Sequence, residues 1–450
     1  MARQLFGTDG VRGPAGEFLS PDLALSLART AVELVCRANS PNQNAHPQVL
    51  IVRDTRESGE MLEAAMAAGI TAAGGDALIA GVLPTPAAPL LVRRHGLALA
   101  AVISASHNPY ADNGIKLFAG DGFKLADHEE ARIEAELDRP AAVPEQIGRV
   151  MPLRDALEDY LRALHTRFAG LDLSGRRVLL DCANGSTYQA APEIFRRFGA
   201  QVVVLANEPD GRNINHGCGS THPEQLIAAM KRGGHDIAFA FDGDGDRVLA
   251  IDRNGVLVDG DELIALAALH LRSSGRLTGG GVAVTVMTNY GFHTAMRDAG
   301  IEVATTAVGD RYVLDELRRR GWALGGEQSG HIIELDFAPS GDGIASALMT
   351  LEALGDRDLA DRDAMQKLPQ RLVNIRGENR ASLTAAMESE PVRAAIARAD
   401  ESLSGRGRVL VRASGTEPLI RVMVEASSQQ ETDHVCEDLA RVVEGALAAA

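Results

Sequence analysis

Aromatic residues, cysteines and long apolar runs are all scarce in this chain. Aromatic side chains make up only 4% of its 450 residues, and its four cysteines (Cys36, Cys182, Cys218 and Cys436) lie far apart with no C-x-x-C pair. This spacing excludes a disulfide framework and a cysteine zinc site, and it predicts buried, inert thiols. No apolar run approaches the roughly 20 residues of a membrane helix, and the start lacks the apolar segment of a signal peptide. We therefore expect a cytoplasmic protein with no membrane attachment.

Basic charge is also in short supply. The chain has 45 Lys and Arg against 61 Asp and Glu, a formal net charge of −16. This balance excludes nucleic acid as a partner, because nucleic-acid binding needs a basic face, but it allows a pocket for small anions. Neither G-x-x-x-x-G-K-[ST] nor G-x-G-x-x-G occurs, so the usual nucleotide-binding signatures are missing. An apolar fraction of 45% predicts a globular chain, and its length predicts two to four domains.

Strands and helices alternate nearly throughout, the pattern of an α/β protein. Apolar runs predict strands at 49–52, 98–103, 178–181, 202–205, 282–287 and 301–305, with helices at 58–73 and 189–198 among the connections. Breaks in this pattern divide the chain into segments 1–150, 151–254, 255–365 and 366–450.

One arrangement occurs three times: a helix that ends in basic residues, a glycine, a strand, and then a polar loop. The helix ends are 91–96, 230–234 and 317–321, and the loops are 104–109, 242–247 and 325–331. Since ligands gather at the carboxyl ends of strands in open α/β sheets, we expect three related domains that share one cleft.

The second of these loops carries the most specific signal. Asp242, Asp244 and Asp246 alternate with glycines directly after an apolar strand. Three carboxylates this close repel one another unless a cation joins them, and ligands that offer only oxygen suit Mg²⁺, Mn²⁺ or Ca²⁺. The alternative is a solvated acidic turn, which would not explain the apolar strand before it.

The remaining loops carry groups for phosphoryl transfer to a sugar. Ser106 can act as a nucleophile or phosphoryl carrier, with a nearby His or Lys to move its proton, although the loop taken alone could be a simple polar turn. The segment 412–418 with Arg421 offers hydroxyls and guanidinium groups to a phosphate, although a capped turn is the alternative. Glu327, Ser329 and His331 suit the hydroxyl groups of a sugar.

These loops, with Phe6–Gly13, Val308–Val313 and Gly341–Ile344, resemble the α-D-phosphohexomutase family over the whole chain. Within that family the resemblance is strongest to the glucosamine-phosphate branch, with phosphomannomutase/phosphoglucomutase as the alternative. It implies three similar mixed α/β domains and a smaller C-terminal α+β domain around a central cleft. Segments 1–150, 151–254, 255–365 and 366–450 would carry the phosphoserine, metal, sugar-binding and phosphate-binding loops in that order. Ser186 and Thr288 stand where the family pattern leads us to expect Ala and Ser.

The resemblance also implies a reaction. Glucosamine 6-phosphate and glucosamine 1-phosphate would interconvert through a phosphoserine enzyme and a 1,6-bisphosphate, a step toward UDP-N-acetylglucosamine and the cell wall. Glucosamine or glucose 1,6-bisphosphate would activate the enzyme. A kinase or autophosphorylation would load Ser106, and a homodimer is possible.

The resemblance assigns a role to each site residue. The metal site would be one Mg²⁺ per subunit, held by Asp242, Asp244, Asp246 and the phosphoryl group on Ser106. The proton movers would be Lys116 and His331, and the residues that steady phosphoryl charge would be Arg12, His107 and Arg247. The sugar would be held by Glu327 and Ser329, and the non-reacting phosphate by Arg412, Ser414, Gly415, Thr416 and Arg421. The rival functions are a phosphosugar-binding protein without catalysis and a metal-dependent phosphatase.

Overall fold

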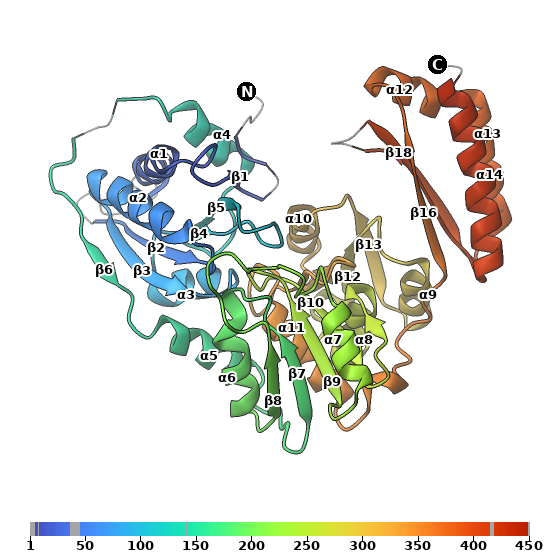
Figure 1. Ribbon diagram of the computed structural model, residues 1–450, viewed down its shortest axis with the longest axis horizontal. Helices are drawn as coiled ribbons and strands as arrows, with labels where there is room; N and C mark the ends of the chain where they lie inside the picture. The colour runs from blue at the N-terminus through green and yellow to red at the C-terminus, as the bar shows by residue number, and fades with distance from the viewer. Residues whose placement is uncertain (1–4, 8, 37–45, 141–142, 415–417, 449–450) are drawn as a thin grey trace. The chain divides into compact units, whose positions relative to one another are not determined.

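The computed structural model describes residues 5–7, 9–36, 46–140, 143–414 and 418–448. The chain forms two compact units, the first made of Met1–Met287 and Glu302–Arg362 and the second of Thr288–Ile301 and Asp363–Ala450. Within the described residues the first unit contains three β-sheets and the second contains one (Figure 1). No helix in these described ranges has both the length and the apolar character needed to cross a membrane.

The first sheet has the strand order β1-β5-β4-β2-β3-β6. Its strands are β1 (Val11–Pro14), β2 (Gln48–Arg53), β3 (Asp76–Val82), β4 (Leu99–Ile103), β5 (Asp112–Ala119) and β6 (Val150–Pro152). Its helices are α1 (Pro21–Ala31), α2 (Gly59–Ala72), α3 (Ala87–His95) and α4 (Asp127–Ala135). All five residues of β4 are buried, because helices cover both faces of this mixed sheet and its central parallel strands are apolar.

The second and third sheets complete the first unit, with the orders β11-β10-β9-β7-β8 and β13-β12-β14-β15. The second sheet contains β7 (Arg177–Asp181), β8 (Gln201–Leu205), β9 (Ile237–Phe241), β10 (Val248–Asp252) and β11 (Leu257–Val258). The third contains β12 (Gly281–Thr285), β13 (Glu302–Thr306), β14 (Leu324–Gly326) and β15 (Ile332–Glu334). The helices of this part are α5 (Ala156–Arg167), α6 (Ala190–Arg197), α7 (Glu224–Lys231), α8 (Gly260–Ser273), α10 (Asp310–Arg320) and α11 (Gly343–Leu354).

One four-strand arrangement occurs in all three sheets: β3-β2-β4-β5, β8-β7-β9-β10 and β13-β12-β14-β15. In each, the first three strands are parallel and the fourth returns antiparallel. The helix before each third strand ends at a glycine with positive φ: Gly96 (62°), Gly233 (80°) and Gly321 (68°). Only glycine adopts this backbone readily, so each glycine stops its helix. The predicted triplication and the mixed α/β fold class are confirmed.

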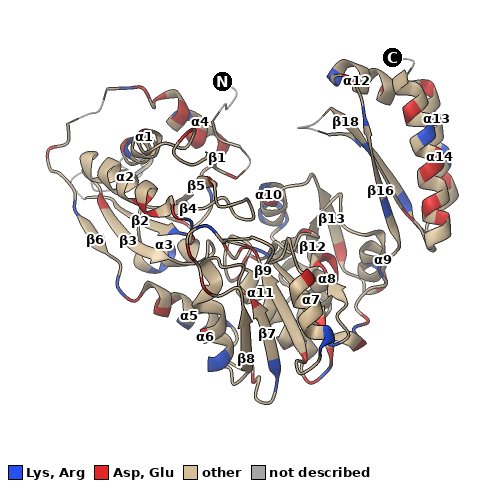
Figure 2. Cartoon of the chain, in the orientation of Figure 1, with Lys and Arg blue, Asp and Glu red and all other residues tan. Residues whose placement is uncertain are grey.

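The second unit is a three-stranded antiparallel sheet packed against helices. Its strands are β16 (Gln370–Arg376), β17 (Arg408–Ala413) and β18 (Leu419–Glu425), in the order β16-β18-β17. Its helices are α9 (Tyr290–Asp298), α12 (Arg380–Glu388), α13 (Glu390–Leu403) and α14 (Gln429–Ala448). Figure 2 shows basic residues (blue) on the strands and many acidic residues (red) on α13 and α14. Glu425 is fully buried, pairs with Arg408 at 2.8 Å and accepts the amide of Tyr290, also at 2.8 Å, which ties α9 to this sheet.

Three of the predicted thiols can be checked. Cys182, Cys218 and Cys436 are free and buried, as expected. The division of the chain at residues 150, 254 and 365 stays a prediction.

Candidate active site

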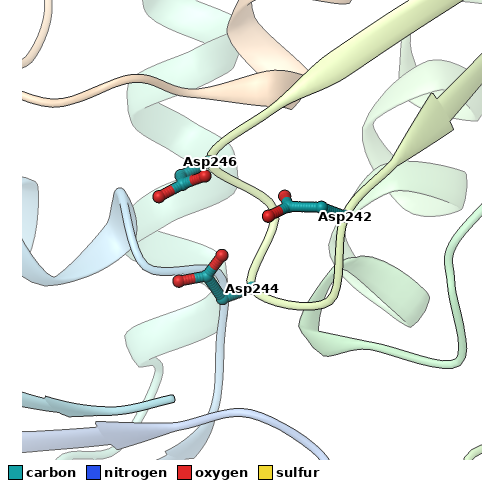
Figure 3. Close-up of side chains that lie close together, drawn as sticks. All are labelled: Asp242, Asp244 and Asp246. Carbon is teal, nitrogen blue, oxygen red and sulfur yellow. The ribbon is translucent and has the colours of Figure 1, made fainter. Parts of the chain in front are cut away.

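Three carboxylates converge in the loop between β9 and β10. Ligand oxygens of Asp242, Asp244 and Asp246 all lie within 4.8 Å of one another, and all three residues are buried (Figure 3). Gly245, with φ 74°, lets the loop turn back so that successive acidic side chains face inward. The alternation of Asp and Gly therefore produces the cluster that the sequence predicts.

The cluster has the properties of a cation site. Asp244 Oδ1 is buried with no hydrogen-bond partner, a state that costs free energy unless a cation is bound. Burial, followed by the charges of Asp246 and Asp244, raises the pKa of Asp242 well above its usual range. A divalent cation would reverse this effect by stabilising the ionised form. The three aspartates can therefore bind a metal ion, and oxygen ligands favour a hard cation.

Ser106 lies against this cluster, in the loop after β4. Its Oγ donates a hydrogen bond to Asp242 Oδ2 at 2.6 Å. Its φ of 53° is in the left-handed region, which is unfavourable for a residue with a side chain and typical of functional loops. The predicted carrier and the predicted metal ligands thus meet directly, although 136 residues separate them along the chain.

His107 and Arg247 lie beside the serine. His107 Nδ1 is 3.2 Å from Ser106 Oγ and 3.3 Å from a guanidinium nitrogen of Arg247. Because a guanidinium only donates, Nδ1 must accept, which places the ring proton on Nε2. Burial, and then the charges of Arg247 and Arg12, lower the pKa of His107, so the neutral ring is favoured. Arg247 also faces Asp246 at 3.8 Å.

Lys116, on β5, is a buried cation among carboxylates. Its Nζ lies 2.9 Å from Asp244, 3.1 Å from Asp9 and 3.6 Å from Asp246. Burial alone would lower the pKa of Lys116, but the attraction of Asp244, Asp9 and Asp246 outweighs it and raises the pKa above its usual value. The ammonium form is therefore the one present at neutral pH.

His331, at the start of the return strand β15, faces two carboxylates. Nδ1 is 3.5 Å from Asp246, and Nε2 is 3.7 Å from Asp310. Burial opposes a charge here, but Asp246 and then Asp310 raise the pKa of His331 to about 9. The amide of Gly341 donates to Nε2 at 3.1 Å. This contact disfavours a proton on Nε2, because the amide N–H and the ring N–H would then point at each other. The hydrogen-bond geometry therefore favours a proton on Nδ1, toward Asp246.

The predicted sugar-binding residues follow β14 in the same unit. Glu327 is buried, and its Oε1 accepts the amide of Gly309 at 3.0 Å, while Ser329 is exposed. Arg12, on β1, forms an ion pair with Asp9, and Asp9 also contacts Lys116. The first unit thus brings together all of the predicted catalytic and metal-binding residues.

The predicted phosphate clamp lies in the second unit. Arg412 and Arg421 are direct cross-strand partners in the β17–β18 pair. Two like charges opposite each other destabilise a sheet, so this pair suits a bound anion. The amide of Ser414 donates to Leu419 O at 2.8 Å where the connection between the strands begins. Gly415 and Thr416 lie outside the described residues.

Sequence reasoning missed an ion-pair chain that borders the site. Lys124 Nζ lies 2.5 Å from Asp9 and 2.6 Å from Asp310, so it bridges carboxylates that in turn face Lys116 and His331. Asp9 and Asp310 stand within motifs that the sequence analysis quoted. Lys124 stands in none of them, and no local spacing signals its partners.

Comparisons with known proteins agree with this architecture. Four sequence profiles described as phosphoglucomutase/phosphomannomutase match in order: alpha/beta/alpha domain I at 3–143, domain II at 158–255, domain III at 259–372 and the C-terminal domain at 372–442. The chain is 49% identical to phosphoglucosamine mutase of Desulforudis audaxviator, covering 98% of this chain and 97% of that protein. It is 47% identical to the phosphoglucosamine mutase of Moorella thermoacetica, over 98% and 99% of the two chains.

Solved structures share the fold. A phosphoglucomutase/phosphomannomutase family protein from Burkholderia thailandensis matches with a TM-score of 0.82 and 24% identity, over 99% of this chain and 98% of that one. An N-acetylphosphoglucosamine mutase from Aspergillus fumigatus, in complex with GlcNAc-6P and magnesium, matches with a TM-score of 0.68 and 19% identity, over 99% and 96%.

Proposed function

The chain belongs to the phosphoglucomutase/phosphomannomutase family, and from this membership we propose that it interconverts glucosamine 6-phosphate and glucosamine 1-phosphate. The full-length similarity to phosphoglucosamine mutases supports the amino-sugar substrate. The observation that carries the chemistry is the 2.6 Å contact between Ser106 Oγ and the aspartate cluster. It joins a phosphoryl carrier to a cation site, which phosphoryl transfer requires.

The metal proposed is Mg²⁺. Asp242, Asp244 and Asp246 would hold it together with a phosphoryl oxygen on Ser106, and the closeness of their oxygens and the buried Asp244 Oδ1 without a hydrogen-bond partner support this assignment. When bound, it supplies positive charge that offsets the negative charge of the phosphoryl group.

The first half-reaction transfers the phosphoryl group from Ser106 to a free hydroxyl of the sugar phosphate. The bond from phosphorus to Oγ breaks and a bond to the sugar oxygen forms, giving a 1,6-bisphosphate. Lys116, held as an ammonium, suits the transfer of a proton to the departing Oγ. His331, between two carboxylates, is the second proton mover: because its pKa of about 9 keeps it protonated at neutral pH, it would take the proton of the attacking hydroxyl after releasing its own.

Three further residues would steady the phosphoryl charge. Arg12 and Arg247 supply guanidinium groups, and neutral His107 contributes a ring N–H. The second half-reaction returns the other phosphoryl group of the bisphosphate to Ser106 after the intermediate turns around.

The substrate would be held at two places. Glu327 and Ser329 would bind sugar hydroxyls. Arg412, Ser414, Gly415, Thr416 and Arg421 would bind the phosphate that is not reacting, and the cross-strand arginine pair supports this role. Because this phosphate is remote from the reacting oxygen, its binding energy can orient either end of the sugar.

The biological setting is part of the proposal. The product would feed UDP-N-acetylglucosamine and cell-wall synthesis. The reaction would occur in the cytoplasm, where charged sugar phosphates are retained, and the free thiols suit a reducing compartment. Ser106 would be loaded by a kinase or by autophosphorylation, glucosamine or glucose 1,6-bisphosphate would sustain activity, and a homodimer is possible.

One assay tests the reaction and the substrate together. The phosphorylated protein is incubated with Mg²⁺, a trace of hexose 1,6-bisphosphate, and glucosamine, glucose or mannose 6-phosphate in turn. We expect 1-phosphate to form fastest from the amino sugar, and we expect Ser106→Ala or a chelator to abolish its formation while the protein stays folded. Faster turnover of mannose or glucose phosphate would favour phosphomannomutase/phosphoglucomutase. Stoichiometric release of inorganic phosphate would indicate a phosphatase, and binding without isomerisation a sensor.

A further inference from the structure

Arg56 is a fully buried arginine that lies behind the serine loop. It follows β2, and its side chain is 0% exposed. Its guanidinium donates to four backbone carbonyls of the loop, those of Ser106, Asn108, Pro109 and Asp112. The distance is 2.9 Å for the Ser106, Asn108 and Asp112 carbonyls. A buried guanidinium with this many loop acceptors must fit the loop in one conformation, since any other would leave donors unsatisfied.

The charge of Arg56 is balanced by a carboxylate that is also tied to the loop. Asp54 Oδ2 accepts from Arg56 Nε at 2.8 Å and from the hydroxyl of Ser104 at 2.6 Å. The Ser104 oxygen in turn accepts the amide of Ser106 at 3.0 Å. The amide of Ser106 is therefore linked to Asp54 through the Ser104 hydroxyl, and its carbonyl is bound directly by Arg56. Both backbone groups are held by the same buried ion pair.

The carbonyl of Ser106 has a second buried donor. It accepts from Arg56 Nη2 and from Asn215 Nδ2, each at 2.9 Å. Two buried donors fix the orientation of this carbonyl and so help to set the left-handed backbone of the residue. That conformation costs of order 1–3 kcal/mol and persists only where the surroundings impose it.

We propose that Arg56 is a positioning residue for phosphoryl transfer: its guanidinium, paired with Asp54, holds Ser106 in the left-handed conformation that directs Oγ at the aspartate cluster. Arg56 does not touch Oγ and acts through the backbone of the loop. This inference rests on the proposed function, because it assigns Ser106 as the phosphoryl carrier.

The test compares Arg56→Lys with Arg53→Lys. A lysine keeps the charge but has one nitrogen and three donors, so it cannot reach all of the carbonyls that the guanidinium fork serves. Arg53 is a matched control, since it is a largely buried arginine at the end of β2, three residues before Arg56, and its guanidinium pairs with Glu60 and Glu63 and not with the serine loop. Displacing a reacting group by about 1 Å can cost 10²-fold in rate, so we expect kcat of Arg56→Lys to fall about a hundredfold. KM for the sugar phosphate should change less than about threefold, because the guanidinium faces the loop backbone, and Arg53→Lys should match the wild type.

A crystal structure of Arg56→Lys supplies a readout that does not depend on turnover. We expect Ser106 to leave the left-handed region and its Oγ to move away from Asp242. An unchanged kcat, a rise in KM alone, or an unmoved Ser106 would each overturn the proposal. Wild-type protein that isomerises no sugar phosphate would instead refute the proposed function, and the crystal structure would still decide whether the guanidinium holds the loop.

If Arg56→Lys does not fold, a milder variant still tests the proposal. Ser104→Ala removes only the hydroxyl that links the Asp54 carboxylate to the Ser106 amide. We expect its kcat to fall about tenfold with KM unchanged, as for loss of one hydrogen bond of about 1.4 kcal/mol. A kcat equal to that of the wild type would overturn the proposal.

Discussion

The carboxyl group of Asp342 should make the stability of the first unit depend on pH. Asp342 caps the N-terminus of α11, is 3% exposed, and accepts the amide of Ala345 at 2.9 Å. The hydroxyl of Tyr160, from α5, donates to both carboxylate oxygens at 3.0 Å. These donors only partly replace the water that the ionised group loses on burial.

Burial therefore raises the pKa of Asp342 from 3.8 to about 6. Since one pKa unit corresponds to about 1.4 kcal/mol, the ionised carboxyl costs about 3 kcal/mol at neutral pH. Below about pH 4 the carboxyl group is protonated in the folded and the unfolded chain alike, so its titration does not change the free energy of unfolding. Between about pH 4 and 6 only the folded chain retains the proton, so its stability falls as pH rises through this window and then levels off.

The variant Asp342→Asn removes the titration and keeps an N-cap residue. We expect the free energy of unfolding of the variant, minus that of the wild type, to be about 2 kcal/mol larger at pH 7.5 than at pH 4.5. For a unit of this size that corresponds to a melting temperature about 2–4 °C higher, measured by calorimetry at the two pH values. Tyr160→Phe removes a donor to the ionised form and should extend the loss of stability to higher pH. A difference between Asp342→Asn and wild type that is the same at both pH values would refute the reasoning.

Three further substitutions have expected outcomes that the structure determines. Lys124→Met should lower the free energy of unfolding by about 3 kcal/mol in chemical denaturation, because it removes the cation that bridges Asp9 and Asp310 and leaves Asp310 facing the more distant His331 at 3.7 Å; a loss under 1 kcal/mol would contradict this. Gly243→Ala places a Cβ 2.6 Å from the carbonyl oxygen of Ser106 and should lower both kcat and the melting temperature, whereas unchanged kinetics would show that the loop gives way. Ser186→Ala should leave the melting temperature unchanged or slightly raised, because the buried hydroxyl has no hydrogen-bond partner, and a clear decrease would reveal a partner.

Short sequence patterns predicted the features of the site that neighbouring residues determine, namely the glycine helix ends and the carboxylate cluster. Glycine after a basic helix end marks a left-handed stop, and this signal located all three third strands. Alternating Asp and Gly predicted a cluster of carboxylates because each intervening glycine lets the loop turn tightly. The strand predicted at 282–287 extends two residues too far: β12 ends at Thr285, and a turn follows it although Val286 and Met287 are apolar.

Partners far apart in the chain could not be predicted in this way. Lys124 meets Asp9 and Asp310 across separations of 115 and 186 residues, and no spacing encodes such a contact. Arg56 reads in the sequence as a charged residue in a loop after a strand, a place where solvent exposure is the usual outcome. Only the fold shows that four backbone carbonyls surround it.

The three repeats explain how one architecture supports three different tasks. Each loop leaves a buried third strand and returns on an antiparallel fourth, so the ends of the loop are fixed by the sheet while its middle can vary. In the first repeat this middle presents a serine, in the second three carboxylates, and in the third a glutamate and a histidine. Among the residues that these three loops present, Ser106 is the one with a left-handed backbone. Its loop is also the one that packs against a buried arginine, Arg56. The carboxylate loop satisfies its turn with glycine instead, which removes the strain at its source. The serine loop needs a buried arginine because the residue in the left-handed conformation must carry a hydroxyl and therefore cannot be glycine. The carboxylate loop has glycine at its left-handed position and needs no such residue behind it.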